Sequence, residues 1–331
     1  MMYDPRFKTA TALLFEFEPS LRQNTRSALL NLGFGDVIAC SDIHEFSTLA
    51  NDGEFDLILA ETDASGSGTH QIIQEIRHNS IGPDPFINVI LFLWNSEPGV
   101  VGEIINAGAD DLITRPISRT QIFTRLKRLV GARKPFVVTA DYFGPDRRKI
   151  SRNPTSIPTM IVPNSLKAKV ESRPELAPTP DAIRSAMKVL KERKISIYSE
   201  QLMRLSSAVI LLSGSPDSYE DRRNVINVMK QRNDALIESI EGTEHMHVVS
   251  LCRALTDLLD LIVTENSALK DKDRELLSHI PYAIHKACAD LHQTAGLAFD
   301  ITAVSSKVSD TRKQANTDAA RTGGKISPTL G

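Results

Sequence analysis

Ala107-Gly108-Ala109-Asp110-Asp111-Leu112-Ile113-Thr114-Arg115-Pro116 is the stretch that decides the fold of the first part of the chain. It joins a helical pattern, which ends near Ala107, to a short apolar run at Leu112 to Thr114. Outward from it, apolar runs and helical patterns alternate from residue 10 to about residue 131. The other runs are residues 12–17, 36–40, 57–60 and 89–94. Five strands separated by helices predict an α/β fold with a doubly wound, five-stranded parallel sheet and helices on both faces.

The carboxyl ends of these strands are where a site is expected. In an open parallel sheet, ligands and reacting groups gather at this edge because the strands end there together. The residues at the ends of four runs are Glu16, Glu61, Leu93 and Arg115. We therefore expect these four side chains to converge.

The segments 12–19, 55–61, 88–94 and 107–116 together resemble the receiver domain of bacterial two-component response regulators, over about residues 10–131. In that family, two adjacent acids after the first strand hold Mg²⁺, and an Asp after the third strand accepts a phosphoryl group. A Thr or Ser follows the fourth strand and a Lys follows the fifth. The resemblance also implies a cis peptide bond before Pro116.

The five chemical positions of that family hold other residues in this chain. The acid pair becomes Glu16 and Phe17, which removes one carboxylate and is expected to put an aromatic ring at the position of the ion. The acceptor becomes Glu61, whose extra methylene disturbs the in-line geometry of phosphoryl transfer. Leu93 has no hydroxyl, and Arg115 keeps a positive charge without the compact ammonium group. These changes disfavour phosphorylation of Glu61, and we expect no cofactor and weak or absent Mg²⁺ binding.

Three interpretations of Glu61 stay open. A standing contact between Glu61 and Arg115 would imitate a permanently engaged state. Alternatively, the pocket is retained for folding and its residues have drifted. In the third interpretation the acceptor is displaced to Asp63, which is two residues further and so on the same face of an extended strand.

Residues 132–179 are rich in Pro and in basic residues, and they predict a semi-extended linker. This segment contains Asp141-Tyr142-Phe143-Gly144-Pro145-Asp146-Arg147-Arg148-Lys149. One interpretation is a docking motif, anchored by Tyr142 and Phe143, that folds against either domain or against the acidic surface of a partner. The other is a solvated basic linker.

Residues 180–305 predict an all-α bundle of about four antiparallel helices, because apolar residues recur there at steps of three and four. The positions that carry this pattern are Leu202, Leu205, Val209, Leu212, Ile226, Met229, Leu236, Ile240, Val248, Cys252, Leu255, Leu259 and Ile262. The same spacing also suits a dimer between chains. Residues 306–331 contain few apolar residues and predict a disordered tail.

His285, Cys288 and His292 recur at helical spacing and could ligate zinc from one helix face. A fourth ligand is not obvious, so packing in the bundle is the favoured interpretation and no metal is expected. An alternative function uses the same histidines. The bundle would then be a histidine phosphotransfer or phosphatase module that acts on another receiver, with His285 or His292 as the reactive group.

The composition limits the other classes of function. The 331 residues carry a formal net charge of −2, and we expect the helices beside the basic segment to supply no basic face. Nucleic acid is therefore not the expected partner. Three widely spaced cysteines and the lack of a long apolar run predict a cytoplasmic protein without a membrane span. We expect an atypical response regulator that is not an enzyme. Its expected partners are another signalling protein at about Gly102–Val130, its own bundle, or a second copy.

Overall fold

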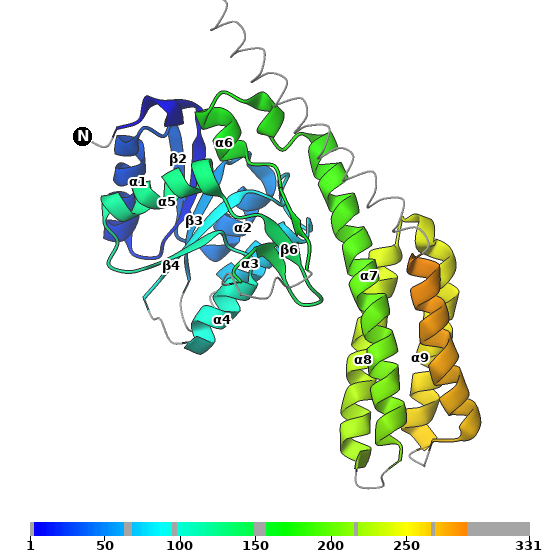
Figure 1. Cartoon of the computed structure of the whole chain (residues 1–331). Coiled ribbons are helices and arrows are strands. Elements are labelled where there is room, and N and C mark those ends of the chain that lie inside the picture. The colour runs from blue at the N-terminus through cyan, green and yellow to red at the C-terminus, as the bar shows by residue number, and fades with distance from the viewer. Residues whose placement is uncertain are drawn as a thin grey trace, which may run out of the picture. The chain divides into compact units, whose positions relative to one another are not determined.

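The computed structural model describes residues 3–62, 68–94, 98–148, 157–214, 218–265 and 269–289 (Figure 1). The chain forms two compact units, Met1–Arg193 and Lys194–Gly331. Asp63, His292 and the predicted tail at residues 306–331 lie outside the described residues.

The first unit contains the predicted five-stranded parallel sheet. Its strands are β1 (Thr11–Phe15), β2 (Asp36–Cys40), β3 (Leu57–Thr62), β4 (Asn88–Leu93) and β5 (Asp111–Thr114), in the order β2-β1-β3-β4-β5. This is the flavodoxin-like doubly wound order. Every residue of β3 and β4 is buried, as expected of central strands that are covered on both faces. The predicted fold class is confirmed.

Helices cover both faces of this sheet. On one face, α1 (Pro19–Leu32) and α5 (Arg119–Ala132) pack on β1, β3 and β4 through a common apolar core. On the other face, α2 (Ile43–Asp52), α3 (Thr69–Arg77) and α4 (Pro98–Asn106) share a second core. The helix ends follow local signals. Glu18 caps α1, Ser118 and Gln121 form a capping box on α5, and Gly33 ends α1 at a φ of 119°.

The described residues of the segment 132–179 are folded, so the prediction of a semi-extended linker differs from the structure. β6 (Phe136–Val138), β7 (Phe143–Pro145) and β8 (Thr159–Met160) form a three-stranded antiparallel sheet in the order β7-β6-β8. A short helix, α6 (Ser165–Val170), packs on α5 and on the N-terminal turn η1 (Pro5–Thr9), and η2 (Pro174–Leu176) follows it. All three residues of β6 are buried, which a composition averaged over the segment does not reveal.

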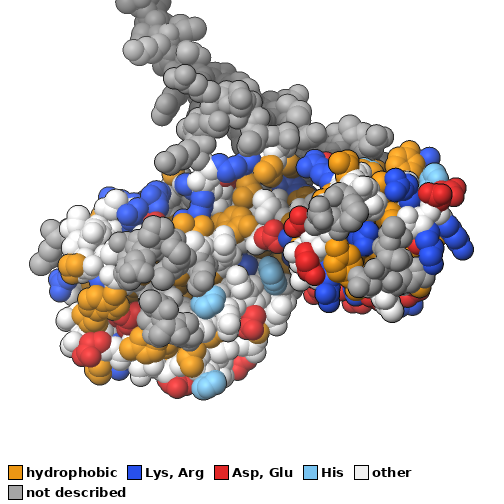
Figure 2. All heavy atoms as spheres, turned by 90° about the horizontal axis from the view of Figure 1, so that it is seen from below, with side chains coloured by type: hydrophobic (Ala, Val, Ile, Leu, Met, Phe, Trp, Pro, Cys, Tyr) orange, Lys and Arg blue, Asp and Glu red, His pale blue; other side chains and the backbone are white. Residues whose placement is uncertain are grey.

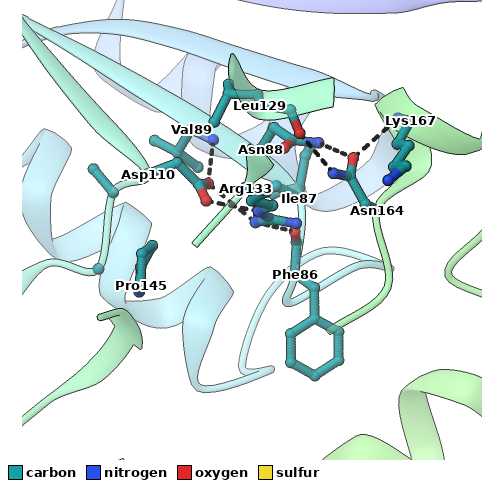
Figure 3. A network of polar contacts seen from close by, with 12 residues as sticks. Phe86, Ile87, Asn88, Val89, Asp110, Leu129, Arg133, Pro145, Asn164 and Lys167 are labelled. Atoms are coloured by element: carbon teal, nitrogen blue, oxygen red, sulfur yellow. Dashed lines mark hydrogen bonds and ion pairs between the residues drawn. The ribbon is translucent and has the colours of Figure 1, made fainter. Parts of the chain in front are cut away.

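We call this folded segment the extension (residues 132–179). Hydrogen bonds join it to the amino ends of the strands. Arg133 donates to the Asp110 carboxylate just before β5, with a distance of 2.7 Å between Nε and Oδ1, and to the carbonyl of Phe86 (Figure 3). Asn164 accepts from the first side chain of β4, Asn88, and donates to the carbonyl of Leu129. The extension therefore covers the edge of the sheet opposite to the carboxyl ends.

The second unit is helical, as predicted. It contains the C-terminal part of α7 (Pro180–Leu212), then α8 (Tyr219–Ile240), η4 (Glu244–Val248), α9 (Val249–Glu265) and a further helix over residues 271–289. Ser206 donates to the carbonyl of Leu277, which joins α7 to the last helix, and Asn233 on α8 donates to the carbonyl of Cys252 on α9. The buried core includes most of the predicted positions, namely Leu202, Val209, Ile226, Met229, Leu236, Ile240, Val248, Cys252, Leu255, Leu259 and Ile262. Within the described residues, no helix is both long and apolar enough for a membrane span.

Candidate functional site: a guanidinium in place of an ion

Three strand ends bring Glu16, Glu61 and Arg115 together at the carboxyl edge of the sheet. Glu16 follows β1, Glu61 lies at the end of β3, and Arg115 follows β5. All three side chains are at most 4% exposed. Two carboxylates and one guanidinium therefore share a buried pocket.

The Glu61 carboxylate has a donor on each oxygen. Its Oε2 accepts from the backbone N–H of Phe17 at 3.0 Å, and its Oε1 accepts from the indole Nε1 of Trp94 at 2.6 Å. The same Oε1 lies 3.5 Å from Nε of Arg115. The Glu61 backbone is held as well, because its carbonyl accepts from the hydroxyl of Thr69 at the start of α3. This carboxylate is thus fixed by groups from three other strand ends.

The Arg115 guanidinium is held by charge and by aromatic rings. It forms a hydrogen-bonded ion pair with Oε1 of Glu16, which also accepts from the hydroxyl of Thr25. Its central carbon lies 5.3 Å from the ring centroids of both Phe92 and Trp94. Burial lowers the pKa of Arg115, yet an Arg side chain stays charged in proteins. A permanent cation therefore occupies this pocket.

Phe17 and Leu93 lie differently from the other pocket residues. The Phe17 ring packs edge-on against Phe15 at 4.9 Å and is 41% exposed, so its backbone N–H, not its ring, reaches Glu61. That the ring occupies the ion position stays a prediction, because the ring contact given by the structure is the one with Phe15. Leu93 is buried in the core beneath α2, α3 and α4, where it brings no polar group to the pocket.

The residues present are a poor fit to Mg²⁺. Magnesium needs near-octahedral oxygen ligands and usually one or two carboxylates with free lone pairs. Here Oε1 of Glu16 and Oε1 of Glu61 both face the guanidinium of Arg115, which is already their cation, and Oε2 of Glu16 is the one oxygen of these two carboxylates without a hydrogen-bond partner in the described structure. Across the described ranges, no cluster of three or more His, Cys, Asp or Glu side chains could hold a metal ion. Asp63, the displaced acceptor candidate, lies outside the described residues.

Sequence reasoning missed Trp94, which is the only tryptophan in the chain. It stands one residue after β4 and is 58% exposed, although its indole N–H reaches the buried Glu61. Periodicity places Trp94 at a strand end but does not say where its side chain points. The useful signal was the large aromatic residue next to Leu93, at the expected edge.

The linker motif lies at the opposite edge. Phe143 is buried between Phe86 and Phe136, with ring centroids at 6.2 and 5.5 Å. The Tyr142 hydroxyl donates to the carbonyl of Pro145, and Arg147 donates to the carbonyl of Ala109. Gly144 packs so closely on Gly108 that a side chain there would meet backbone at 2.8 Å. The remaining pair, Asp146 and Arg148, forms a local ion pair at 2.7 Å. The motif is therefore folded against its own domain.

The histidine candidates lie in the second unit. His285 is half-buried, and its Nδ1 lies 3.2 Å from the hydroxyl of Ser199 on α7. Cys288 is fully buried, and burial raises its pKa to about 12. His292 lies outside the described residues. This arrangement agrees with packing of His285 and Cys288 inside the bundle.

No protein-family model matches the sequence, and no curated protein matches it. Among solved structures, the chemotaxis protein CheY4 of Vibrio cholerae is 20% identical, covers 36% of this chain and 98% of its own, and has a TM-score of 0.32. The signal receiver domain of a histidine kinase from Syntrophus aciditrophicus is 19% identical, with 44% and 100% covered and a TM-score of 0.34. The receiver domain of a sensor histidine kinase from Pseudomonas aeruginosa, with a magnesium ion in its active-site cleft, is 22% identical, with 36% and 95% covered and a TM-score of 0.31. Receiver domains, the family that the sequence resembles, thus stand among the similar solved structures.

Proposed function

We propose that this chain is an atypical response regulator of two-component type, which acts through protein–protein interaction and independently of phosphorylation. The observation that carries the proposal is the engagement of Arg115 by both Glu16 and Glu61. In this proposal the receiver-like unit stays in the one state in which Arg115 contacts both carboxylates. It neither binds Mg²⁺ tightly nor turns over phosphate.

The pocket supports this proposal by its charge. A phosphoryl group carries negative charge that a metal must offset during transfer. In this chain the positive charge beside Glu61 comes from Arg115, whose guanidinium is enclosed by Phe92 and Trp94. Both oxygens of Glu61 already accept hydrogen bonds, so in-line attack on a phosphoryl donor would require these contacts to break.

The signalling output would then be binding. The partner surface proposed here is the side of the unit formed by α4, β5 and α5, at about Gly102–Val130. The candidates for the partner are another signalling protein, the chain's own helical unit, or a second copy of the chain. No catalytic role is proposed for the chain.

The experiment that tests this proposal exposes the purified chain to acetyl phosphate and Mg²⁺ and reads its intact mass. We expect no phosphoryl adduct on the wild type. Glu61→Asp restores the shorter acceptor, and Phe17→Asp in addition restores the second acid of the pair. If the length of the Glu61 side chain and the weak Mg²⁺ site block phosphorylation, the double variant should form the phosphoryl adduct faster than the single variant does.

Two controls make the outcome decisive. Asp63→Asn removes the displaced acceptor, and Arg119→Gln removes an exposed cation of α5 that lies outside the pocket. A stable adduct on the wild type would overturn the proposal. If that adduct were lost in the Asp63→Asn variant and retained in the Arg119→Gln variant, the phosphorylation site would be Asp63.

A further inference from the structure

The charges of the first unit are separated along the chain. Residues 1–100 contain five Lys or Arg and fourteen Asp or Glu, whereas residues 101–193 contain eighteen and nine. The first unit is therefore neutral as a whole but strongly polar in its charge distribution. Figure 2 shows Lys and Arg side chains gathered along one border of this unit, while Asp, Glu and His side chains lie at the opposite border.

The helices on the two faces of the sheet also differ in charge. The helices on one face, α1 and α5, contain six Lys or Arg and no Asp or Glu. On the other face, α2 contains Glu45 and Asp52 and no Lys or Arg. The expectation that the helices beside the basic segment supply no basic face is thus wrong for α5, which directly precedes that segment.

The cations of α5 are Arg119, Arg125, Lys127 and Arg128, and we call them the α5 cations; Arg125 is half-buried and the other three are exposed. Two of them share one acid. Arg125 Nε lies 3.4 Å from Oδ2 of Asp111, and Arg128 pairs with the same oxygen. One carboxylate cannot neutralise two guanidiniums, so this pair keeps an excess positive charge.

The other two α5 cations differ from this pair. The charge of Lys127 contributes to lowering the pKa of Asp4, but that carboxyl already pairs with Arg6. Arg119 and Lys127 are exposed, and neither forms an ion pair with a carboxylate in the described part of the chain. The Lys127 ammonium instead lies 4.4 Å from the centroid of the Phe123 ring. A helix surface with such an excess of positive charge is electrostatically complementary to an anionic surface.

We propose that the α5 cations bind an acidic segment of a partner protein. This inference rests on the proposed function, because it names the chemistry of the partner that the α5 side would take. A carboxylate partner is proposed because the anion that Arg125 and Arg128 contact in this structure is itself a carboxylate, that of Asp111. A nucleic-acid duplex is disfavoured because this unit is neutral overall and its opposite face is acidic.

The test uses the full chain and measures fluorescence anisotropy of three labelled probes. These are a Glu-rich peptide, the same peptide with every Glu replaced by Gln, and a DNA duplex. We expect the Glu-rich peptide to bind, the Gln peptide not to bind, and the affinity to fall as salt rises from about 0.05 to about 0.2 M. Arg119→Glu with Lys127→Glu should weaken binding about tenfold.

A matched control and a second variant separate this surface from general charge. Arg184→Glu with Lys188→Glu makes the same charge change at exposed positions of α7, and it should leave the affinity within about twofold of the wild type. Asp111→Asn releases Arg125 and Arg128 from their acid, so it should strengthen binding by about two- to fivefold. An effect of net charge alone would change the affinity for the peptide equally in the α5 and α7 variants. It would not predict the loss of affinity to be confined to Arg119 and Lys127.

Three results would overturn the inference. These are no binding of the Glu-rich peptide at low salt, equal losses in the α5 and α7 variants, or tighter binding of the DNA duplex than of the peptide. The last result would assign the surface to nucleic acid. Failure here is distinct from failure of the proposed function, because a phosphoryl adduct on the wild type would end the latter without changing peptide binding.

Discussion

Nε of Arg115 lies 3.5 Å from Oε1 of Glu61, and both side chains are almost fully buried. A second carboxylate, Glu16, pairs with the other end of the guanidinium. Removal of the cation would leave two buried carboxylates without a counter-charge, and this is more costly than the loss of the ion pairs themselves.

Arg115→Met should therefore lower the free energy of unfolding by about 3–5 kcal/mol. Urea unfolding followed by the fluorescence of Trp94 measures this directly, since the only tryptophan of the chain lies beside Arg115. Arg119→Met is the control, because it removes an exposed cation from α5 and should change stability by less than about 0.5 kcal/mol. Equal stabilities of the two variants would show that Arg115 does not compensate these carboxylates.

The extension is the second feature with a clear energetic consequence. Phe136 on β6 is fully buried, and the guanidinium carbons of Arg77 and Arg133 lie 5.4 and 4.9 Å from its ring centroid. Phe136→Ala should cost about 3–5 kcal/mol of unfolding free energy in the first unit. Ile161→Ala, in the same extension but at an 88% exposed position, should cost less than about 0.5 kcal/mol. A mild effect of Phe136→Ala would mean that the extension behaves as the linker that its composition predicts.

The sequence predicts the sheet well because each strand has a local signal. β3 and β4 are buried along their whole length, so they read as unbroken apolar runs with the site residues at their ends. The extension has no such signal. Its strands are two or three residues long, and Phe136 packs on Phe86 and Arg77, which are distant in the sequence. Such contacts leave no periodicity to detect.

The pocket was predictable in part for a similar reason. Strand ends bring Glu16, Glu61 and Arg115 together, and topology alone predicts that convergence. Side-chain direction is not contained in the topology. The Phe17 ring turns toward Phe15 and the Trp94 indole turns toward Glu61, and both directions depend on packing that a single sequence does not specify.

Asp84 gives the first unit a pH dependence. Burial raises its pKa from its ordinary value of 3.8 to about 6, since Oδ2 is buried without a hydrogen-bond partner in the described structure, and the N–H that Phe86 donates to Oδ1 opposes this rise only in part. The native state thus holds the proton more tightly than the unfolded state does. The stabilising contribution is complete below about pH 4 and is lost as the pH rises through about 6.

Asp84→Asn should remove this part of the pH dependence and stabilise the first unit at neutral pH by about 3 kcal/mol. Urea unfolding of the wild type and the variant at about pH 4, 5, 6 and 7 measures it, again through Trp94. Asp52→Asn, at an exposed position on α2, is the control and should follow the wild type. A wild-type curve that stays parallel to Asp84→Asn across this range would contradict a raised pKa at Asp84.

The cysteines give a prediction for both units. Cys40 lies in the first unit, and Cys252 and Cys288 lie in the bundle, and all three are buried. Burial raises each pKa to about 12, so almost none of the reactive thiolate is present near pH 8. A disulfide reagent such as DTNB should label no cysteine quickly in the native chain and all three after denaturation.

The labelling rate of Cys252 and Cys288 should then follow opening of the bundle. A core substitution there, such as Leu255→Ala, should therefore speed their labelling and leave that of Cys40 unchanged. Rapid labelling of Cys288 in the native wild type would instead show an accessible thiol on the helix of His285, and would reopen the metal-ligand interpretation of that face.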